Sequence, residues 1–150
     1  MTKPLAVITG ASSGIGEATA KAFSNAGYPT LLLARRIEIM ESFNLKNSIC
    51  KKIDVRDRDA LVSAIREAEK QYGPTDMMFN NAGVARLADI STQDPSEWDE
   101  MIDVNTKGVM NGIYAVMKDM KARQSGTIVN MSSIAGRKVY GDHTVYCGTD

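Results

Sequence analysis

Short apolar runs alternate with stretches of helical periodicity along this chain. A continuous apolar run predicts a buried strand, whereas apolar residues three and four positions apart predict a helix with one buried face. The predicted strands are residues 5–9, 30–34, 49–53, a segment centred on 77–79, and 127–131. The predicted helices are residues 14–26, 37–43, 60–72, 96–105 and 107–122. Repeated strand-helix units with fully apolar strands predict an α/β fold, a doubly wound parallel sheet with helices on both faces.

Composition narrows the class of protein without identifying a partner. The 150 residues, 43% of them hydrophobic, suffice for one core, so we expect a single domain over residues 1–150. Eighteen basic residues balance eighteen acidic ones, so we expect no nucleic-acid or membrane partner. Cys50 and Cys147 form no C-x-x-C motif, and the amino terminus does not resemble a signal peptide. These features favour a reduced, cytoplasmic setting.

A glycine-rich turn follows the first predicted strand and opens the first predicted helix. Its spacing is G-x-x-x-G-x-G, in which glycines permit unusual backbone angles and close approach of a pyrophosphate. The helix that begins there directs unpaired N–H groups and a positive dipole end at phosphates. Glu17 stands where a P-loop would carry lysine, which argues against nucleoside triphosphate hydrolysis. The turn predicts a Rossmann-like dinucleotide site, with cofactor-binding residues Gly10, Ser12, Ser13, Gly14, Ile15 and Gly16.

Two arginines, Arg35 and Arg36, follow the second predicted strand. Dinucleotide-binding folds usually carry an acidic residue in this region for the adenosine ribose hydroxyls. A carboxylate would repel a 2′-phosphate, whereas guanidinium groups bind it through charge-assisted hydrogen bonds. We therefore expect NADP(H) to be preferred over NAD(H). The alternative is that both arginines are solvated loop residues, in which case a carboxylate at position 35 would leave the selectivity unchanged.

Four ordered motifs resemble the classical short-chain dehydrogenase/reductase family, and the resemblance extends from Pro4 to Asp150. They are the turn of residues 9–16, Asn80-Asn81-Ala82-Gly83, Asn105 within Asp-Val-Asn, and Asn130-Met131-Ser132-Ser133 followed by Tyr146. The resemblance implies that Asp54 and Val55 lie beside the adenine. It also implies that Asn81, Ala82 and Gly83 border the cofactor.

The same resemblance implies a catalytic set made of Asn105, Ser133 and Tyr146. Hydride transfer between a nicotinamide and a carbonyl or carbinol carbon requires a proton to move at oxygen. In the family the tyrosine exchanges that proton, the serine holds the oxygen, and the asparagine supports a proton-relay water. Ser133 is preferred to Ser132 because it precedes Tyr146 by the family's usual 13 positions.

The sequence departs from the family's pattern at Asp150, where the motif has a lysine four residues after the tyrosine. A carboxylate there would oppose, rather than favour, loss of the Tyr146 proton. Three hypotheses stay open. The chain is an incomplete NADP(H)-dependent oxidoreductase of secondary alcohols and carbonyls, with five of the family's usual seven strands. Alternatively, it is a catalytically inactive dinucleotide-binding fragment, or a regulatory subunit that retains only the fold.

Substrate and assembly follow only from the resemblance. It implies a small or medium-sized alcohol, hydroxy acid or ketone as substrate. For the full-length parent it implies a homodimer or homotetramer, formed in part through the helix that carries residues 111–120. No metal site is expected, because His143 is the only histidine and is predicted to lie in a surface loop.

Overall fold

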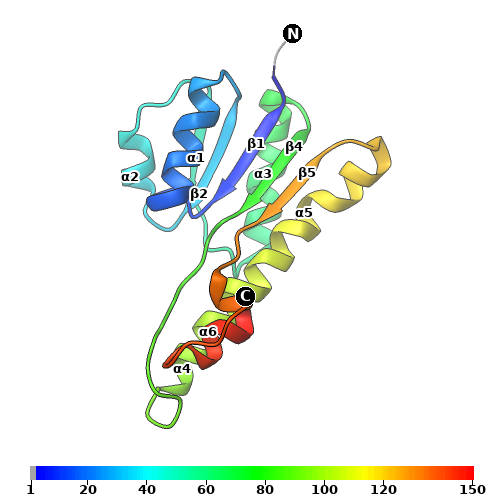
Figure 1. Ribbon diagram of the computed structural model, residues 1–150. Helices are drawn as coiled ribbons and strands as arrows, with labels where there is room; N and C mark the ends of the chain where they lie inside the picture. The colour runs from blue at the N-terminus through cyan, green and yellow to red at the C-terminus, as the bar shows by residue number, and fades with distance from the viewer. Residues whose placement is uncertain (1–2) are drawn as a thin grey trace.

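The computed structural model describes residues 3–150, which form a five-stranded parallel sheet in the order β3-β2-β1-β4-β5 (Figure 1). The strands are β1 (Leu5–Thr9), β2 (Thr30–Ala34), β3 (Ser48–Lys52), β4 (Thr75–Asn80) and β5 (Thr127–Asn130). Every neighbouring pair is parallel. The chain runs outward from β1 to β3, returns to β4 beside β1, and continues outward to β5. The predicted α/β fold with a doubly wound parallel sheet is therefore confirmed.

Helices cover both faces of the sheet because its strands are apolar on both sides. On one face, α1 (Gly14–Asn25) and α2 (Ile37–Ser42) enclose a core that includes Ile8 and Leu32. On the other face, α3 (Arg58–Tyr72) and α5 (Gly108–Arg123) enclose a second core. The central strands β1 and β2 are buried along their whole length. They hold the loops that follow them in fixed positions.

One predicted feature of the second helical layer is wrong. The sequence predicted two helices over 96–105 and 107–122, but the helical backbone continues without a break through α4 (Pro95–Met101), η1 (Ile102–Lys107) and α5. The segment η1 is a π-helical turn, which widens the helix locally and is frequent at functional sites. The wider turn changes the spacing of the apolar positions, which explains why the periodicity indicated two helices.

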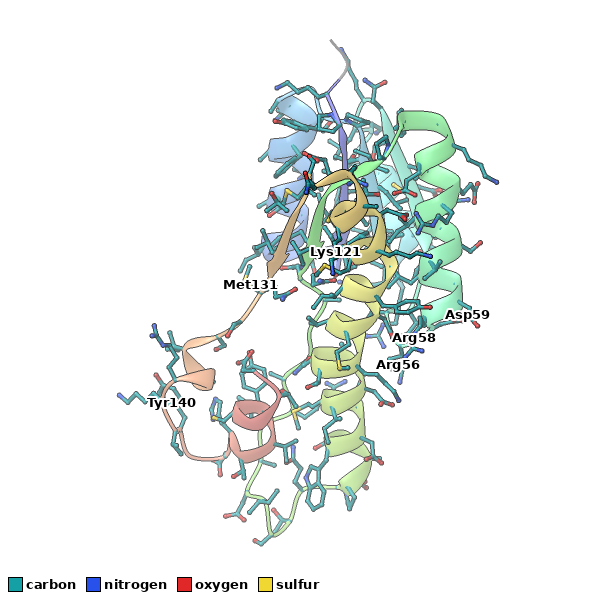
Figure 2. The ribbon with its side chains drawn as sticks, turned by 90° about the vertical axis from the view of Figure 1, so that its right-hand side faces the viewer. Arg56, Arg58, Asp59, Lys121, Met131 and Tyr140 are labelled. Carbon is teal, nitrogen blue, oxygen red and sulfur yellow. The ribbon has the colours of Figure 1, made fainter. Side chains whose placement is uncertain are left out.

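The long helix extends past the carboxyl ends of the strands, as Figure 1 shows. The short helices η2 (Ile134–Gly136) and α6 (Thr144–Thr149) lie at this end of the sheet, and α6 packs against α4. The loop of residues 81–94 runs beside them, and its Ala88 N–H donates to the Asp142 carbonyl at 3.1 Å. Figure 2 shows Tyr140 projecting from the segment between η2 and α6. The carboxyl end of the sheet is thus enclosed by residues from the second half of the chain.

Within residues 3–150, no helix combines the length and the apolar character needed to cross a bilayer. The strand β5 forms one edge of the described sheet, and its Val129 side chain is 38% exposed.

Candidate cofactor and active site

A cavity of about 320 Å³ opens at the carboxyl ends of the strands. It is lined by residues that end or follow four of the strands and by one residue of η1: Gly10, Ser12, Ser13, Leu33, Ala34, Arg35, Arg36, Ile53, Asp54, Val55, Asn81, Ala82, Gly83, Val84 and Val104. The glycine turn, the arginine pair, Asp54-Val55 and the 81–83 segment therefore meet in one place. They come from positions up to 73 residues apart, which the parallel sheet brings to the same edge.

The three glycines of the turn have different structural roles. Gly10 has φ of +63°, and a Cβ there would lie 2.8 Å from the Ala82 Cα. A Cβ on Gly16 would lie 2.3 Å from the Gly10 carbonyl oxygen, so this glycine permits α1 to pack against the turn. Gly14 has φ of +56° and no neighbouring atom within 4 Å of the corresponding point. Open space over the start of α1 leaves its backbone accessible to a phosphate.

Thr9, at the end of β1, ties the glycine turn to the segment after β4. Its buried hydroxyl donates to the Phe79 carbonyl at 3.3 Å and accepts from the Asn81 and Ala82 N–H groups at 3.0 and 3.1 Å. The Asn81 side-chain amide donates back to the Thr9 carbonyl at 3.1 Å. Sequence reasoning gave Thr9 no role of its own. The sequence feature that could have indicated this role is the Thr9 hydroxyl itself, a polar group at the end of an otherwise apolar, buried strand.

Arg36 is held beside the glycine turn by two serines. Its Nη2 donates to Ser12 Oγ at 3.2 Å and to Ser13 Oγ at 3.0 Å. Arg35 lines the same cavity, and both arginines are exposed. Two guanidinium groups, two hydroxyls and a helix N-terminus together can bind a phosphate monoester at this end of the cavity.

The Asp54 carboxylate is paired with Arg56 across the turn of residues 54–56, which follows β3. Arg56 Nε donates to Oδ1 at 3.0 Å and Nη2 donates to Oδ2 at 2.6 Å. Hydrogen bonding from Arg56 lowers the pKa of Asp54, partial burial opposes this, and the charge of Arg35 adds to the lowering. A carboxylate therefore stands at the cavity wall with its charge largely balanced by arginine.

A second cavity of about 280 Å³ adjoins the first. It is lined by Ile15, Asn81, Ala82, Gly83, Val84, Ala85, Asn105, Val109, Met131, Ser132, Tyr146 and Asp150. The segment 81–84 lines both cavities, so a ligand that follows this segment passes from one cavity into the other. Two of the three predicted catalytic residues, Asn105 and Tyr146, lie in this second cavity.

Asn105 lies within the π-helical turn and uses its whole side chain to fix the cavity wall. Its Oδ1 accepts from the Val84 N–H at 2.8 Å, and its Nδ2 donates to the Val84 carbonyl at 2.8 Å. The same Nδ2 donates to the Thr149 hydroxyl at 3.0 Å. One side chain therefore holds the long helix, the loop after β4 and α6 together.

The two serines after β5 have different surroundings. Ser132 lines the second cavity, whereas Ser133 is absent from its lining. The Ser133 Oγ accepts from the Ala135 N–H at 3.1 Å and so begins η2. The assignment of Ser133 as the oxygen-binding serine stays a prediction, and this geometry makes Ser132 the residue to compare it with.

Asp150 and Tyr146 line the same cavity, and the Tyr146 ring is half-buried. Removal of water from part of the Asp150 carboxyl raises its pKa, an effect that a Ser133 backbone hydrogen bond opposes. His143 lies just before α6, with its ring centre 6.2 Å from that of Tyr146. In the described part of the chain, His, Cys, Asp and Glu side chains form no group of three or more that could hold a metal ion.

Comparison with known proteins places these motifs in a family. Residues 4–149 match the family described as short chain dehydrogenase. An uncharacterized oxidoreductase of Staphylococcus saprophyticus is 42% identical over 147 residues, which are 95% of this chain and 60% of that protein. Two Listeria oxidoreductases are also covered over 60% of their length. The chain thus spans about 60% of the length of these curated relatives.

Solved structures share the arrangement. The closed form of a serine dehydrogenase complexed with NADP+ superposes with a TM-score of 0.92 at 30% identity, covering 97% of this chain and 60% of that one. An alcohol dehydrogenase from the archaeon Thermococcus sibiricus, complexed with 5-hydroxy-NADP, gives a TM-score of 0.91 at 27% identity, with 98% and 65% covered. The family match spans nearly the whole chain, and the fold agrees with it. This chain belongs to the short-chain dehydrogenase family of oxidoreductases.

Proposed function

We propose that this protein is an NADP(H)-dependent oxidoreductase that interconverts a secondary alcohol and a carbonyl compound. The observation that carries the proposal is the pair of adjoining cavities that share the segment 81–84. The first has the arginine and serine groups that suit a phosphate, and the second has a tyrosine hydroxyl. The NADP+ complex of the related serine dehydrogenase supports the choice of cofactor.

The cofactor would lie with its adenosine phosphates in the first cavity and its nicotinamide in the second. When bound, it supplies or accepts the hydride. Arg35 and Arg36 would bind the 2′-phosphate, and the helix N-terminus at Gly14 would bind the pyrophosphate. Asn81, Ala82 and Gly83 form the wall along which the cofactor extends.

In the reductive direction the substrate carbonyl oxygen gains a proton as the carbon gains the hydride. Tyr146 donates that proton from its hydroxyl, and a hydrogen bond from serine orients the oxygen. Asn105 holds Val84 and α6 in place at the cavity wall. It also supports a relay water that returns a proton to the tyrosine. The reverse direction uses the same groups, with Tyr146 accepting the proton.

A second candidate function is binding without turnover, as an inactive dinucleotide-binding fragment or a regulatory subunit. One observation favours it: Asp150 brings a carboxylate into the cavity that holds Tyr146. A carboxylate disfavours the tyrosinate that proton transfer leaves behind.

Two measurements on the purified protein separate these functions. We expect NADPH to bind and to be oxidised in the presence of a carbonyl from a panel of ketones, aldehydes and oxo acids. Tyr146→Phe should abolish that rate and leave NADPH binding within about twofold, because only the hydroxyl is removed. Binding without oxidation across the panel supports the second function, and an unchanged rate in Tyr146→Phe contradicts the mechanism.

A matched pair of variants tests which serine binds the substrate oxygen. We expect Ser133→Ala to reduce the rate of NADPH oxidation by a factor of roughly 10² to 10³, typical of losing one donor to a developing oxyanion. Ser132→Ala is the control, with the same atoms removed one residue away. A larger loss in Ser132→Ala would transfer the role to the serine that lines the cavity.

We also propose a homodimer or homotetramer for the full-length parent protein. A groove of about 560 Å³ lies between α3 and α5, and Met110 and Tyr114 beside it are 62% and 66% exposed. Exposed apolar side chains on one helix face are typical of subunit interfaces. Sedimentation equilibrium should show a dimer or larger species. The Tyr114→Glu variant should sediment as a monomer.

A further inference from the structure

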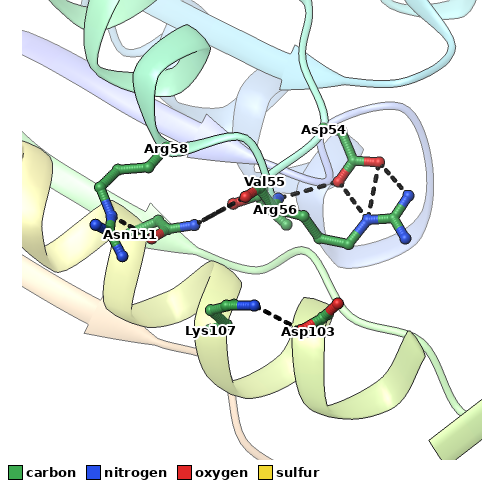
Figure 3. A network of polar contacts seen from close by, with 7 residues as sticks. All are labelled: Asp54, Val55, Arg56, Arg58, Asp103, Lys107 and Asn111. Carbon is green, nitrogen blue, oxygen red and sulfur yellow. Dashed lines mark hydrogen bonds and ion pairs between the residues drawn. The ribbon is translucent and has the colours of Figure 1, made fainter. Parts of the chain in front are cut away.

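Val55, which lines the adenosine end of the first cavity, is held by α5 on two sides. Its side chain lies against Gly108, where a Cβ would be only 2.6 Å from the Val55 Cγ2. Its carbonyl accepts a hydrogen bond of 2.8 Å from the Asn111 side-chain amide, one helical turn further along (Figure 3). Both contacts act on a residue that is 7% exposed. The position of the cavity wall is therefore set by the long helix.

Asn111 is 1% exposed, and its polar atoms have partners within the described chain. Besides Val55, its Nδ2 lies 3.4 Å from the Arg56 carbonyl, and its Oδ1 accepts from Arg58 Nε at 2.9 Å. Figure 2 shows Arg56 and Arg58 near the start of α3, on the side of α5. A buried asparagine on a helix face otherwise occupied by apolar residues loses solvation that only such hydrogen bonds restore.

The turn that Asn111 holds carries the groups that face the adenosine. Asp54 and Val55 both line the cavity, and Arg56 pairs with Asp54 across the turn. The same continuous helix carries Asn105, six residues earlier, at the second cavity. One rigid element therefore contacts the wall of each cavity.

We propose that Asn111 is a positioning residue for the adenosine half of the cofactor. Its amide holds the Val55 carbonyl and so fixes the 54–56 turn at the distance from the glycine turn that adenosine requires. This inference rests on the proposed NADP(H) site and adds a residue that lines neither cavity. Asn111 acts through Val55 rather than by touching the cofactor.

The test measures binding of 2′,5′-ADP, which carries only the adenosine half. We expect Asn111→Leu, which has nearly the same shape and no donor, to weaken binding about tenfold, the loss typical of a buried hydrogen bond. Asn111→Asp retains an acceptor for Arg58 but loses the donor to Val55, and we expect a similar loss. Arg58→Met leaves that donor intact and should bind within about twofold of the unaltered protein.

A stability effect is separated from positioning by a variant at the opposite end of the sheet. Thr30→Val removes a buried hydroxyl that donates to Ser48 Oγ at 3.1 Å, at the amino end of β2. It should lower the denaturation midpoint and leave binding of 2′,5′-ADP within about twofold. Equal binding losses in Thr30→Val and Asn111→Leu would overturn the proposal, as would unchanged binding in folded Asn111→Leu or Asn111→Asp.

Amide hydrogen exchange tests the same point without substitution. In the unaltered protein, 2′,5′-ADP should slow amide exchange in the 54–56 turn and in the first turns of α5 together, because Asn111 joins these two segments. Slowing of exchange confined to the 54–56 turn would overturn the proposal. Failure of the unaltered protein to bind 2′,5′-ADP at all would refute the proposed function instead, so the two failures are distinguishable.

Discussion

Replacement of Arg36 by leucine should remove most of the discrimination between NADP(H) and NAD(H). Arg36 is already oriented by the Ser12 and Ser13 hydroxyls, so binding a 2′-phosphate requires little further ordering of its side chain. A hydrogen bond between charged groups contributes about 1.5–3 kcal/mol. Because Arg36 is exposed and Arg35 remains, we take a value just below this range, about 1.4 kcal/mol, which corresponds to tenfold in affinity.

The assay is the ratio of the Kd values of 5′-AMP and 2′,5′-ADP, measured by titration calorimetry on one protein preparation. The two ligands differ only in the 2′-phosphate, so the contribution of the adenosine cancels. We expect Arg36→Leu to reduce this ratio about tenfold and to leave the Kd of 5′-AMP within about twofold. Raising the salt concentration should reduce the ratio in the unaltered protein and have less effect in the variant.

Lys52→Leu is the matched control, because it removes an exposed positive charge at the end of β3 from a residue outside the cavity lining. Its ratio should stay within about twofold of the unaltered value. An unchanged ratio in folded Arg36→Leu would refute the phosphate assignment. A ratio lowered equally in both variants would show that net charge alone attracts the ligand.

Two further predictions concern stability and charge. Gly112→Ala places a Cβ 1.9 Å from Asn80 Oδ1, so we expect a loss of about 1–3 kcal/mol in urea denaturation. Gly148→Ala, with no atom within 4 Å, is the control, and an equal loss in both variants would contradict the packing argument. Arg56→Ala should raise the pKa of Asp54 toward its usual value, because the hydrogen bond and charge of Arg56 lower it; carboxyl ¹³C NMR would follow the titration. Because the folded pKa is lowered, the ion pair stabilises the fold above the pKa of the unfolded carboxyl, and this stability is lost as the pH falls through the folded pKa. An unshifted titration in the variant would contradict this.

The sequence predicted the sheet well because each strand has its own boundary signal. Thr30–Ala34 follows a glycine of φ +82° at position 27, and Thr75–Asn80 follows a glycine of φ +85° at position 73. Such residues end helices for local steric reasons that are visible in the sequence. The parallel arrangement also followed from local reasoning, since strands joined by helical connections lie parallel in a sheet that the helices cover.

The errors and omissions arise where distant segments meet. The π-helical turn contains Asn105, whose side chain binds both backbone groups of Val84, and no local pattern specifies that partner. Likewise the exposure of Ser132 to the second cavity, and the burial of Asn111 against Val55, depend on how three elements pack. The candidate site residues were found through motif resemblance, whereas the residues that hold them became visible only in three dimensions.

The return of the chain from β3 to β4 has a consequence for how the protein can be studied. Because β4 pairs with β1 across about 70 residues, neither cavity exists until the two halves of the sheet have joined. A nucleotide that contacts both halves binds only the folded chain, so it raises the free energy of unfolding by about 2.7 kcal/mol at a concentration of 100 times Kd. A thermal-shift screen of nucleotides is therefore also a screen for the joined sheet, and it requires neither a substrate nor a catalytic assay.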